Sequence, residues 1–385
     1  MRQKNDLSSK KIKTFTPKLI IAASESSADI LYASKFNAPD DFLYYETESE
    51  KCIVVSPLEY SRALEEAGEE VKVIDRVPLM KQVRQGESFA VALSRILGIN
   101  CWQVPASFPY SEAQALLNAG IQLQCLEDQP FFPERLVKNE KEIEAIQASV
   151  AVTEEIMCQL RDILIKSKIN TKGFLEYKRR ILTCEFLRSE LEGNFKKKGF
   201  SASHTIIAPG IQGAAPHNHG TGPVPAGVPI VADIFPRSDA TGYWGDMTRT
   251  FVKGKAKPIV KRAFKAVKKA SDTAKKMLHD GVIAADVHKA AAEVLTAAGF
   301  PTGRGKDGMP CGFFHGLGHG VGLEIHEAPR VSPLNEKPLV SGNVVSIEPG
   351  LYYPEWGGIR LEDLVVIQKK SYRNFNTMEM ELELP

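Results

Sequence analysis

The chain has 385 residues, of which 43% are hydrophobic and 25% are charged, and 49 basic against 47 acidic side chains leave a net charge of +2. This composition is typical of a soluble globular protein, and the chain is longer than a domain with a single typical core. The small net charge does not indicate a nucleic-acid-binding surface. We therefore expect two domains and no nucleic-acid partner.

The amino-terminal segment MRQKNDLSSKKIK is basic and is followed by only a short apolar run, LIIAA. Such a run is too short for a signal peptide or a membrane span, so we expect a frayed, solvated terminus and no membrane partner. The cysteines show no paired spacing, which favours reduced thiols in a cytoplasm. They lie at positions 52, 101, 125, 158, 184 and 311.

Strand-like and helix-like runs alternate over the first third of the chain. The strand-like runs are 18–23, 41–47, 51–57, 71–75, 101–105 and 121–127, and the helix-like runs are 59–68, 86–98 and 111–120. This alternation predicts an α/β domain over residues 1–135.

A proline- and charge-rich linker, 128–142, precedes a helix whose apolar residues follow helical spacing. These residues are Ile143, Ile146, Val150, Ile156 and Leu160. Further helices are expected at roughly 174–195, 258–279 and 284–298, between β-rich runs. Residues 136–385 are therefore predicted to form an α+β domain, with the domain boundary near residue 135.

Four carboxylates and one imidazole fall into short stretches of the last third and predict a dinuclear metal site. They are Asp233, Asp246, His319, Glu348 and Glu362. Oxygen ligands with one imidazole favour Mn²⁺, with Zn, Co or Fe as alternatives.

Two predicted hairpins bring the carboxylates together. The first turns within RSDATG, and a turn centred on Asp239 and Ala240 sets Asp233 directly opposite Asp246, with Cβ atoms roughly 5 Å apart. The second turns at PEWG, and a centre at Glu355 sets Glu348 opposite Glu362. Like charges so placed are destabilising unless cations neutralise them.

The motifs GYWGDMTRTF, HGLGHGVGLEIHEAP, SIEPGLY and GIRLED, within about residues 137–368, resemble those of the pita-bread metallopeptidases. That family comprises methionine aminopeptidase, aminopeptidase P, prolidase and the metal-free creatinase. The resemblance implies a pita-bread catalytic domain over 136–385, preceded by a creatinase- or prolidase-like α/β domain, and a homodimer. It also implies that Asp246 and Glu362 bridge two metals, that Asp233 completes one, and that His319 and Glu348 complete the other.

The resemblance gives roles to two further histidines. It implies that His326 contacts the scissile group and that His217 binds the substrate near the departing nitrogen, whereas His219 is less suited by its spacing to Asp233. His326 lies seven residues after His319, an odd step that a regular strand would point to the opposite face. The glycines at 318, 320 and 322 permit the bend that returns it.

Three more residues match the proline-directed branch of the family. His315 and Arg360 separate this chain from methionine aminopeptidase, and Arg330 matches an arginine that grips the free carboxylate of a dipeptide in prolidases. For Arg360 the alternative is charge balance beside the carboxylates, and for Arg330 it is surface pairing with an acid such as Glu327.

Other chemistries fail on inspection. Val321 occupies the position at which a dinucleotide-binding motif needs its third glycine, and the sequence has no Walker lysine motif and no nucleophile elbow. Cys311 is expected to be a small structural hydrophobic residue and not a nucleophile. The resemblance to the proline-directed branch implies a metal-dependent Xaa-Pro peptidase, either aminopeptidase P or a dipeptidase, with proline-containing peptides as substrates, and we expect Glu348 to be the proton shuttle. The alternatives are an aminopeptidase without proline preference and a non-catalytic pita-bread binding protein.

Overall fold

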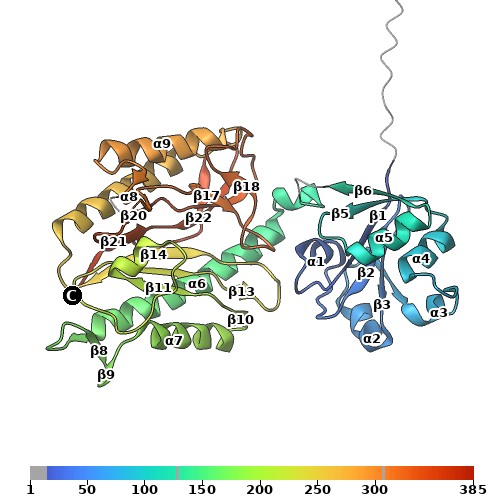
Figure 1. The fold of residues 1–385 in the computed structure, drawn as a ribbon, viewed down its shortest axis with the longest axis horizontal. Coiled ribbons are helices and arrows are strands. Elements are labelled where there is room, and N and C mark those ends of the chain that lie inside the picture. Colours follow the sequence, from blue (N-terminus) through green and yellow to red (C-terminus); the bar gives the residue numbers. More distant parts are fainter. Residues whose placement is uncertain (1–14, 127–129, 306–307) are drawn as a thin grey trace, which may run out of the picture. The chain divides into compact units, whose positions relative to one another are not determined.

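The computed structural model describes residues 15–126, 130–305 and 308–385. The basic terminal segment and the first residues of the expected linker lie outside these ranges. The chain divides into two compact units, one ending at Pro133 and the other running from Glu134 to Pro385 (Figure 1). No helix among the described residues is long and apolar enough to cross a membrane.

The first unit is built on a six-stranded sheet in the order β4-β3-β2-β1-β5-β6. Strands β1, β2 and β3 pair antiparallel, whereas β3–β4, β1–β5 and β5–β6 are parallel. The strands are β1 (Lys18–Ala22), β2 (Phe42–Glu46), β3 (Lys51–Val55), β4 (Val71–Asp75), β5 (Cys101–Pro105) and β6 (Gln122–Leu126).

Both faces of this sheet are buried. Tyr44 and Tyr45, neighbours in β2, point to opposite faces, and each enters a separate hydrophobic core. The helices that cover the faces are α1 (Ala28–Ser34), α2 (Pro57–Glu66), α3 (Arg76–Met80), α4 (Phe89–Leu97) and α5 (Tyr110–Asn118). This arrangement confirms the expected α/β class.

The second unit has two main sheets, ordered β11-β12-β14-β24 and β18-β17-β19-β22-β23. The first comprises β11 (Ile206–Pro209), β12 (Ile230–Ile234), β14 (Met247–Lys253) and β24 (Glu383–Leu384). The second comprises β17 (Gly318–Gly320), β18 (Glu327–Val331), β19 (Val344–Ile347), β22 (Asp363–Ile367) and β23 (Tyr372–Asn374). Smaller ladders are formed by β7 (Lys168–Ile169), β8 (Leu175–Tyr177), β9 (Arg180–Ile181), β10 (Phe200–Ser201), β13 (Arg237–Ser238), β15 (Gly303–Arg304), β16 (Pro310–Cys311), β20 (Gly350–Tyr353) and β21 (Gly357–Arg360).

Helices cover these strands from two sides (Figure 1). Helices α8 and α9 pack on the strands that include β19, β20, β21 and β22, whereas α6 and α7 pack on β11, β12 and β14. The helical segments are η1 (Pro133–Leu136), α6 (Glu140–Lys166), α7 (Cys184–Lys197), η2 (Gly210–Ala214), α8 (Pro258–Lys276) and α9 (Ala284–Ala297). Alternating strands and helices around two cores give the expected α+β class.

The helix expected from residue 174 begins only at Cys184, so that prediction was wrong over its first turns. Strands β8 and β9 form a hairpin there, turned by Lys178 and Arg179 at φ of 50° and 64°. Thr183 then accepts a hydrogen bond from the Phe186 N–H and caps the helix.

The first predicted hairpin has a different register from the one expected. Asp233 pairs with Thr248, not with Asp246, which precedes β14. The cause is a wide tip in which β13 leaves β12 and pairs with β10. Asp246 lies two residues from Thr248, and the even step keeps it on the face of Asp233.

The second hairpin has the expected register. Tyr353 pairs with Gly357, which centres the turn on Glu355, and Ile347 pairs with Asp363 on the far side of the carboxylates. Glu348 and Glu362 occupy matching positions between these paired segments.

Candidate metal centre

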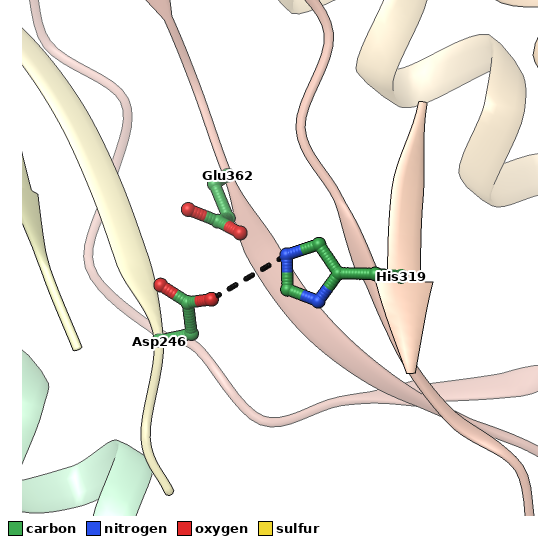
Figure 2. Close-up of side chains that lie close together, drawn as sticks. All are labelled: Asp246, His319 and Glu362. Atoms are coloured by element: carbon green, nitrogen blue, oxygen red, sulfur yellow. Dashed lines mark ion pairs between the residues drawn. The ribbon is translucent and has the colours of Figure 1, made fainter. Parts of the chain in front are cut away.

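Three of the predicted ligands converge in the interior of the second unit. Ligand atoms of Asp246, His319 and Glu362 all lie within 4.8 Å of one another, and all three residues are buried. The side chains point toward a common centre from separate strands or strand ends (Figure 2). His319 Nε2 lies 3.8 Å from Asp246 Oδ2.

The carboxylates stand where the chain passes from one ladder to another. Glu348 lies between β19 and β20, Glu362 lies between β21 and β22, and Asp246 immediately precedes β14. Regular pairing is interrupted at these junctions, so the side chains turn inward without disturbing either ladder.

The His319 ring is oriented from both sides. Its Nδ1 lies 3.2 Å from the Gly320 carbonyl, so a proton on Nδ1 leaves Nε2 as the ligating atom. Nε2 lies 3.2 Å from Glu348 Oε1, which also accepts a hydrogen bond from the Ser346 hydroxyl. Glu348 thus joins the cluster through His319.

Asp233 lies beside the cluster and is shared with Arg360. Its Oδ2 accepts a 2.6 Å bond from Arg360 Nη2, while its buried Oδ1 has no hydrogen-bond partner among the described residues. Buried carboxylate oxygens are ordinarily satisfied, so this oxygen is suited to a cation.

The electrostatics of the carboxylates favour a bound cation. Burial, followed by the charges of Glu362, Asp233 and Glu348, raises the pKa of Asp246 well above its usual value. Burial, followed by Glu348 and Asp233, likewise raises the pKa of Glu362. Burial would raise the pKa of Glu348, but the hydrogen bond with His319 and the charges of His319, His315 and Arg360 together outweigh burial and lower the pKa to about 2. Without cations the cluster holds protons, and divalent cations fit as their replacement.

Neighbouring side chains hold Glu362 in place. The Thr248 hydroxyl donates a 2.7 Å bond to Glu362 Oε2 and accepts one from Arg360 Nε. The buried Arg249 donates to the Glu362 carbonyl at 2.6 Å and pairs with Asp363 at 2.8 Å.

The cluster lies at a cavity of about 1150 Å³ that also exposes the other predicted site residues. His217, His315, His326, Arg330 and Arg360 all line it, and so does His219. The structure therefore brings every predicted site residue to one cavity.

The bend predicted between His319 and His326 is present. The register between β17 and β18 shifts between Gly318 and Gly320, and the His319 and His326 ring centroids lie 4.4 Å apart. A Cβ on Gly318 would lie 1.9 Å from the Ser346 carbonyl oxygen, so only glycine permits this approach. Burial, His319 and Arg330 lower the pKa of His326 to about 4.

His315 and Arg360 are linked through Tyr352. Arg360 Nη1 donates to the Tyr352 hydroxyl at 2.9 Å, and that hydroxyl lies 3.0 Å from His315 Nε2. His315 Nδ1 lies 2.7 Å from the Gly316 carbonyl, so both ring nitrogens have protein partners. Arg360 also pairs with Asp233 in the carboxylate cluster. This contact agrees with the alternative role given to Arg360 from the sequence, which is to balance the charge of the carboxylates.

Sequence reasoning missed several of these supporting groups. Ser346 precedes Glu348 by two residues on the same strand face, and this spacing could have identified it. Tyr352 gave no local signal, because its contacts with His315 and Arg360 are set by the tertiary fold alone.

A metallopeptidase is the class of protein that this fold and cluster define. The model of metallopeptidase family M24 matches residues 142–369. An Xaa-Pro dipeptidase of Pyrococcus horikoshii is 31% identical over 339 residues, covering 86% of this chain and 85% of the relative. The chain belongs to metallopeptidase family M24 and is a hydrolase, in agreement with the resemblance in the sequence.

Solved structures show the same fold along the chain. The prolidase from Pyrococcus horikoshii OT3 has a TM-score of 0.76 and 25% identity, over 95% of each chain. The X-Pro aminopeptidase from Thermotoga maritima MSB8 has a TM-score of 0.79 and 23% identity, over 96% of this chain and 97% of that one. These matches confirm the expected pita-bread fold, and family membership implies divalent metal ions.

Proposed function

We propose that the protein is an Xaa-Pro dipeptidase that uses two divalent cations, with Mn²⁺ best suited to the oxygen-rich ligand set. The observation that carries this proposal is the buried Asp246, His319 and Glu362 cluster in a cavity whose wall presents Arg330. The Xaa-Pro dipeptidase names of the relatives support the same substrate class. Asp233 and Glu348 complete the proposed ligand set.

Bound divalent cations would polarise the scissile carbonyl and stabilise the negative charge of the transition state. Glu348, hydrogen-bonded to Ser346, would exchange protons with the reacting groups. His326 is neutral at pH 7 because its pKa is about 4, so it acts as a hydrogen-bonding imidazole and not as an acid. His217, which also lines the cavity, would bind near the proline nitrogen.

Arg330 is the proposed carboxylate-binding residue. The alternative, pairing of Arg330 with Glu327, is not formed, because the Glu327 carboxylate is bonded to Arg135 and Lys138. Among the described residues no ion pair engages Arg330, and it faces the cavity. A guanidinium there suits the free carboxylate of a dipeptide, which a tripeptide places one residue further away.

The test compares Ala-Pro, Ala-Pro-Ala and Ala-Ala as substrates in the presence of Mn²⁺. We expect Ala-Pro to be hydrolysed fastest and Arg330→Met to lose about 2 to 4 kcal/mol of transition-state stabilisation on Ala-Pro alone. Arg262→Met, an exposed arginine on α8, is the matched control. Equal losses on Ala-Pro and Ala-Pro-Ala would favour aminopeptidase P, and preference for Ala-Ala would favour the aminopeptidase without proline specificity.

Absence of hydrolysis together with absence of bound metal would support the non-catalytic alternative. A homodimer, expected from the family resemblance, is tested by sedimentation. The six free cysteines support a reducing, cytoplasmic location.

A further inference from the structure

We propose that Glu327 is a positioning residue that holds His326 against the metal cluster, an inference that rests on the proposed peptidase function. Its side chain is 4% exposed and accepts ion-pair bonds from Arg135 Nη2 at 2.9 Å and Lys138 Nζ at 2.5 Å. These two cations are themselves 4% and 2% exposed. The cluster of Glu327, Arg135 and Lys138 lies outside the proposed ligand set.

The Glu327 carboxylate lies at the centre of the turn that carries His326. Glu327 is the residue of β18 paired with Gly320 of β17. A Cβ on Gly322 would lie 2.5 Å from Glu327 Oε1, and the Glu324 N–H donates to Glu327 Oε2 at 3.4 Å. The chain between the two histidines therefore wraps around this carboxylate, and His326 is its immediate neighbour.

The same turn also contacts the first hairpin, which carries the proposed ligands Asp233 and Asp246. The Trp244 N–H donates to the Gly322 carbonyl at 3.0 Å, and Trp244 Nε1 donates to the Leu323 carbonyl at 3.1 Å. Trp244 lies two residues before Asp246. The turn that carries His326 is thus held both by the segment next to Asp246 and by the segment before α6.

The charge state of Glu327 decides whether this arrangement persists. Two buried cations are stable here because a buried carboxylate pairs with both. An amide at this position would leave the buried Lys138 ammonium without its counter-charge, whereas Arg135 keeps its pair with Glu324, and the turn would have to open to hydrate Lys138. Opening would release His326 while leaving Asp246, His319 and Glu362 on their own strands.

Glu324 provides a matched control. It also pairs with Arg135, at 2.7 Å, but its side chain is 53% exposed. An exposed pair contributes little, so the same chemical change at Glu324 should be nearly silent.

The experiment measures kcat, KM and metal content for Glu327→Gln, Lys138→Met and Glu324→Gln on Ala-Pro. We expect Glu327→Gln to lower kcat at least tenfold, and Lys138→Met to lower it to a smaller extent, both with unchanged metal content. Glu324→Gln should stay within twofold of wild type. Wild-type kcat in folded Glu327→Gln would overturn the inference, as would loss of metal from it.

A double-mutant cycle with His326→Ala separates positioning from general destabilisation. If Glu327 acts through His326, Glu327→Gln should change kcat less than twofold in the His326→Ala background. Fully additive losses would overturn the inference. Lys138→Met enters the same cycle if Glu327→Gln does not fold.

A readout without turnover distinguishes this inference from the proposed function. In the metal-free protein we expect the imidazole NMR resonances of His326 to shift and broaden in Glu327→Gln, while those of His217 stay in place. Unmoved His326 resonances would overturn the positioning role. A wild type without Xaa-Pro activity would overturn the proposed function and leave the NMR comparison to judge the positioning role.

Discussion

At the residue scale, the fold buries carboxylates whose like charges must be neutralised by protons or by counter-ions. Asp246 and Glu362 both have a raised pKa, and Asp233 keeps one buried carboxylate oxygen without a partner among the described residues. Arg360 supplies a single positive charge from one side. The remaining negative charge makes the cluster less stable when empty than when it holds cations.

Replacing Asp246 tests this conclusion directly. We expect Asp246→Asn to lose metal and activity, while the melting temperature of the metal-free protein stays equal or rises because one repulsive carboxylate is gone. Plasma mass spectrometry and metal-free thermal unfolding give the two readouts. Asp239→Asn, an exposed aspartate in the same hairpin tip, is the control. Two retained metals with normal turnover would contradict the site.

The residue types of the centre could be predicted from the sequence, but several roles could not. Five candidate ligands in ordered motifs were visible, and the structure brings them to one cavity. The engagement of Arg360 with Asp233 depends on strands 127 residues apart in sequence. No local pattern encodes such a pairing.

At the element scale, a buried ion cluster joins three elements next to the proposed ligand Glu362. Asp363 in β22 accepts bonds from Arg249 in β14 at 2.8 Å and from Lys275 in α8 at 2.7 Å. Burial would raise the pKa of Asp363, but the two cations outweigh burial and lower it. The ion pairs of Asp363 with Arg249 and Lys275 therefore stabilise the fold when Asp363 is ionised.

This cluster predicts a pH-dependent stability. A lowered pKa in the folded state contributes stability above the unfolded pKa of about 3.9, and the contribution is lost as pH falls through the folded pKa. We expect Asp363→Asn to cost about 3 to 5 kcal/mol in urea unfolding at pH 7 and pH 5, because two buried cations lose their partner. The gap to wild type should narrow below about pH 4. A gap that is constant down to pH 3, or matched by the exposed Asp162→Asn, would contradict this account.

Two glycines predict opposite effects of the same substitution. Gly193 lies in α7 with no atom within 4 Å of the position that an added methyl group would take, so Gly193→Ala should stabilise the protein by about 0.8 to 1 kcal/mol. At Gly318 the methyl would lie 1.9 Å from the Ser346 oxygen, so Gly318→Ala should cost about 1 to 3 kcal/mol or more. Urea unfolding of both metal-free variants measures the difference, and equal effects would show that the β17 contact is not tight.

Element predictions succeeded where local patterns determine the structure. The second hairpin has a three-residue turn, 354–356, that fixes its register, and α8 and α9 follow their apolar periodicity. The first hairpin failed because β13 pairs with β10, a contact between residues 36 or more positions apart. Residues 174–183 failed because isolated propensity does not reveal the capping and turn geometry before α7.

At the scale of the whole molecule, each unit has its own hydrophobic core. In the first unit, residues on both faces of one sheet are buried, whereas the second unit buries two larger cores against α6 to α9. Composition and length predicted two domains, because a chain of this size exceeds one typical core. Which strands share a sheet could not be derived from composition, since strand order depends on long-range pairing.

Because each unit has its own hydrophobic core, we expect the second unit, which contains the metal cluster, to be stable alone. A chain beginning at Glu134 keeps Arg135, Lys138 and all residues of the cavity, so we expect it to fold and to bind the same number of metal ions as the full chain. Its calorimetric transition should match one of two transitions of the full chain, because domains with separate cores unfold separately. A chain beginning at Asn139 is the matched control, since it keeps the capping box of α6 but lacks both cations that bind Glu327. This shorter chain should melt at a lower temperature than the chain from Glu134. Failure of the longer chain to fold, or a single transition in the full chain, would show that the units depend on each other for stability.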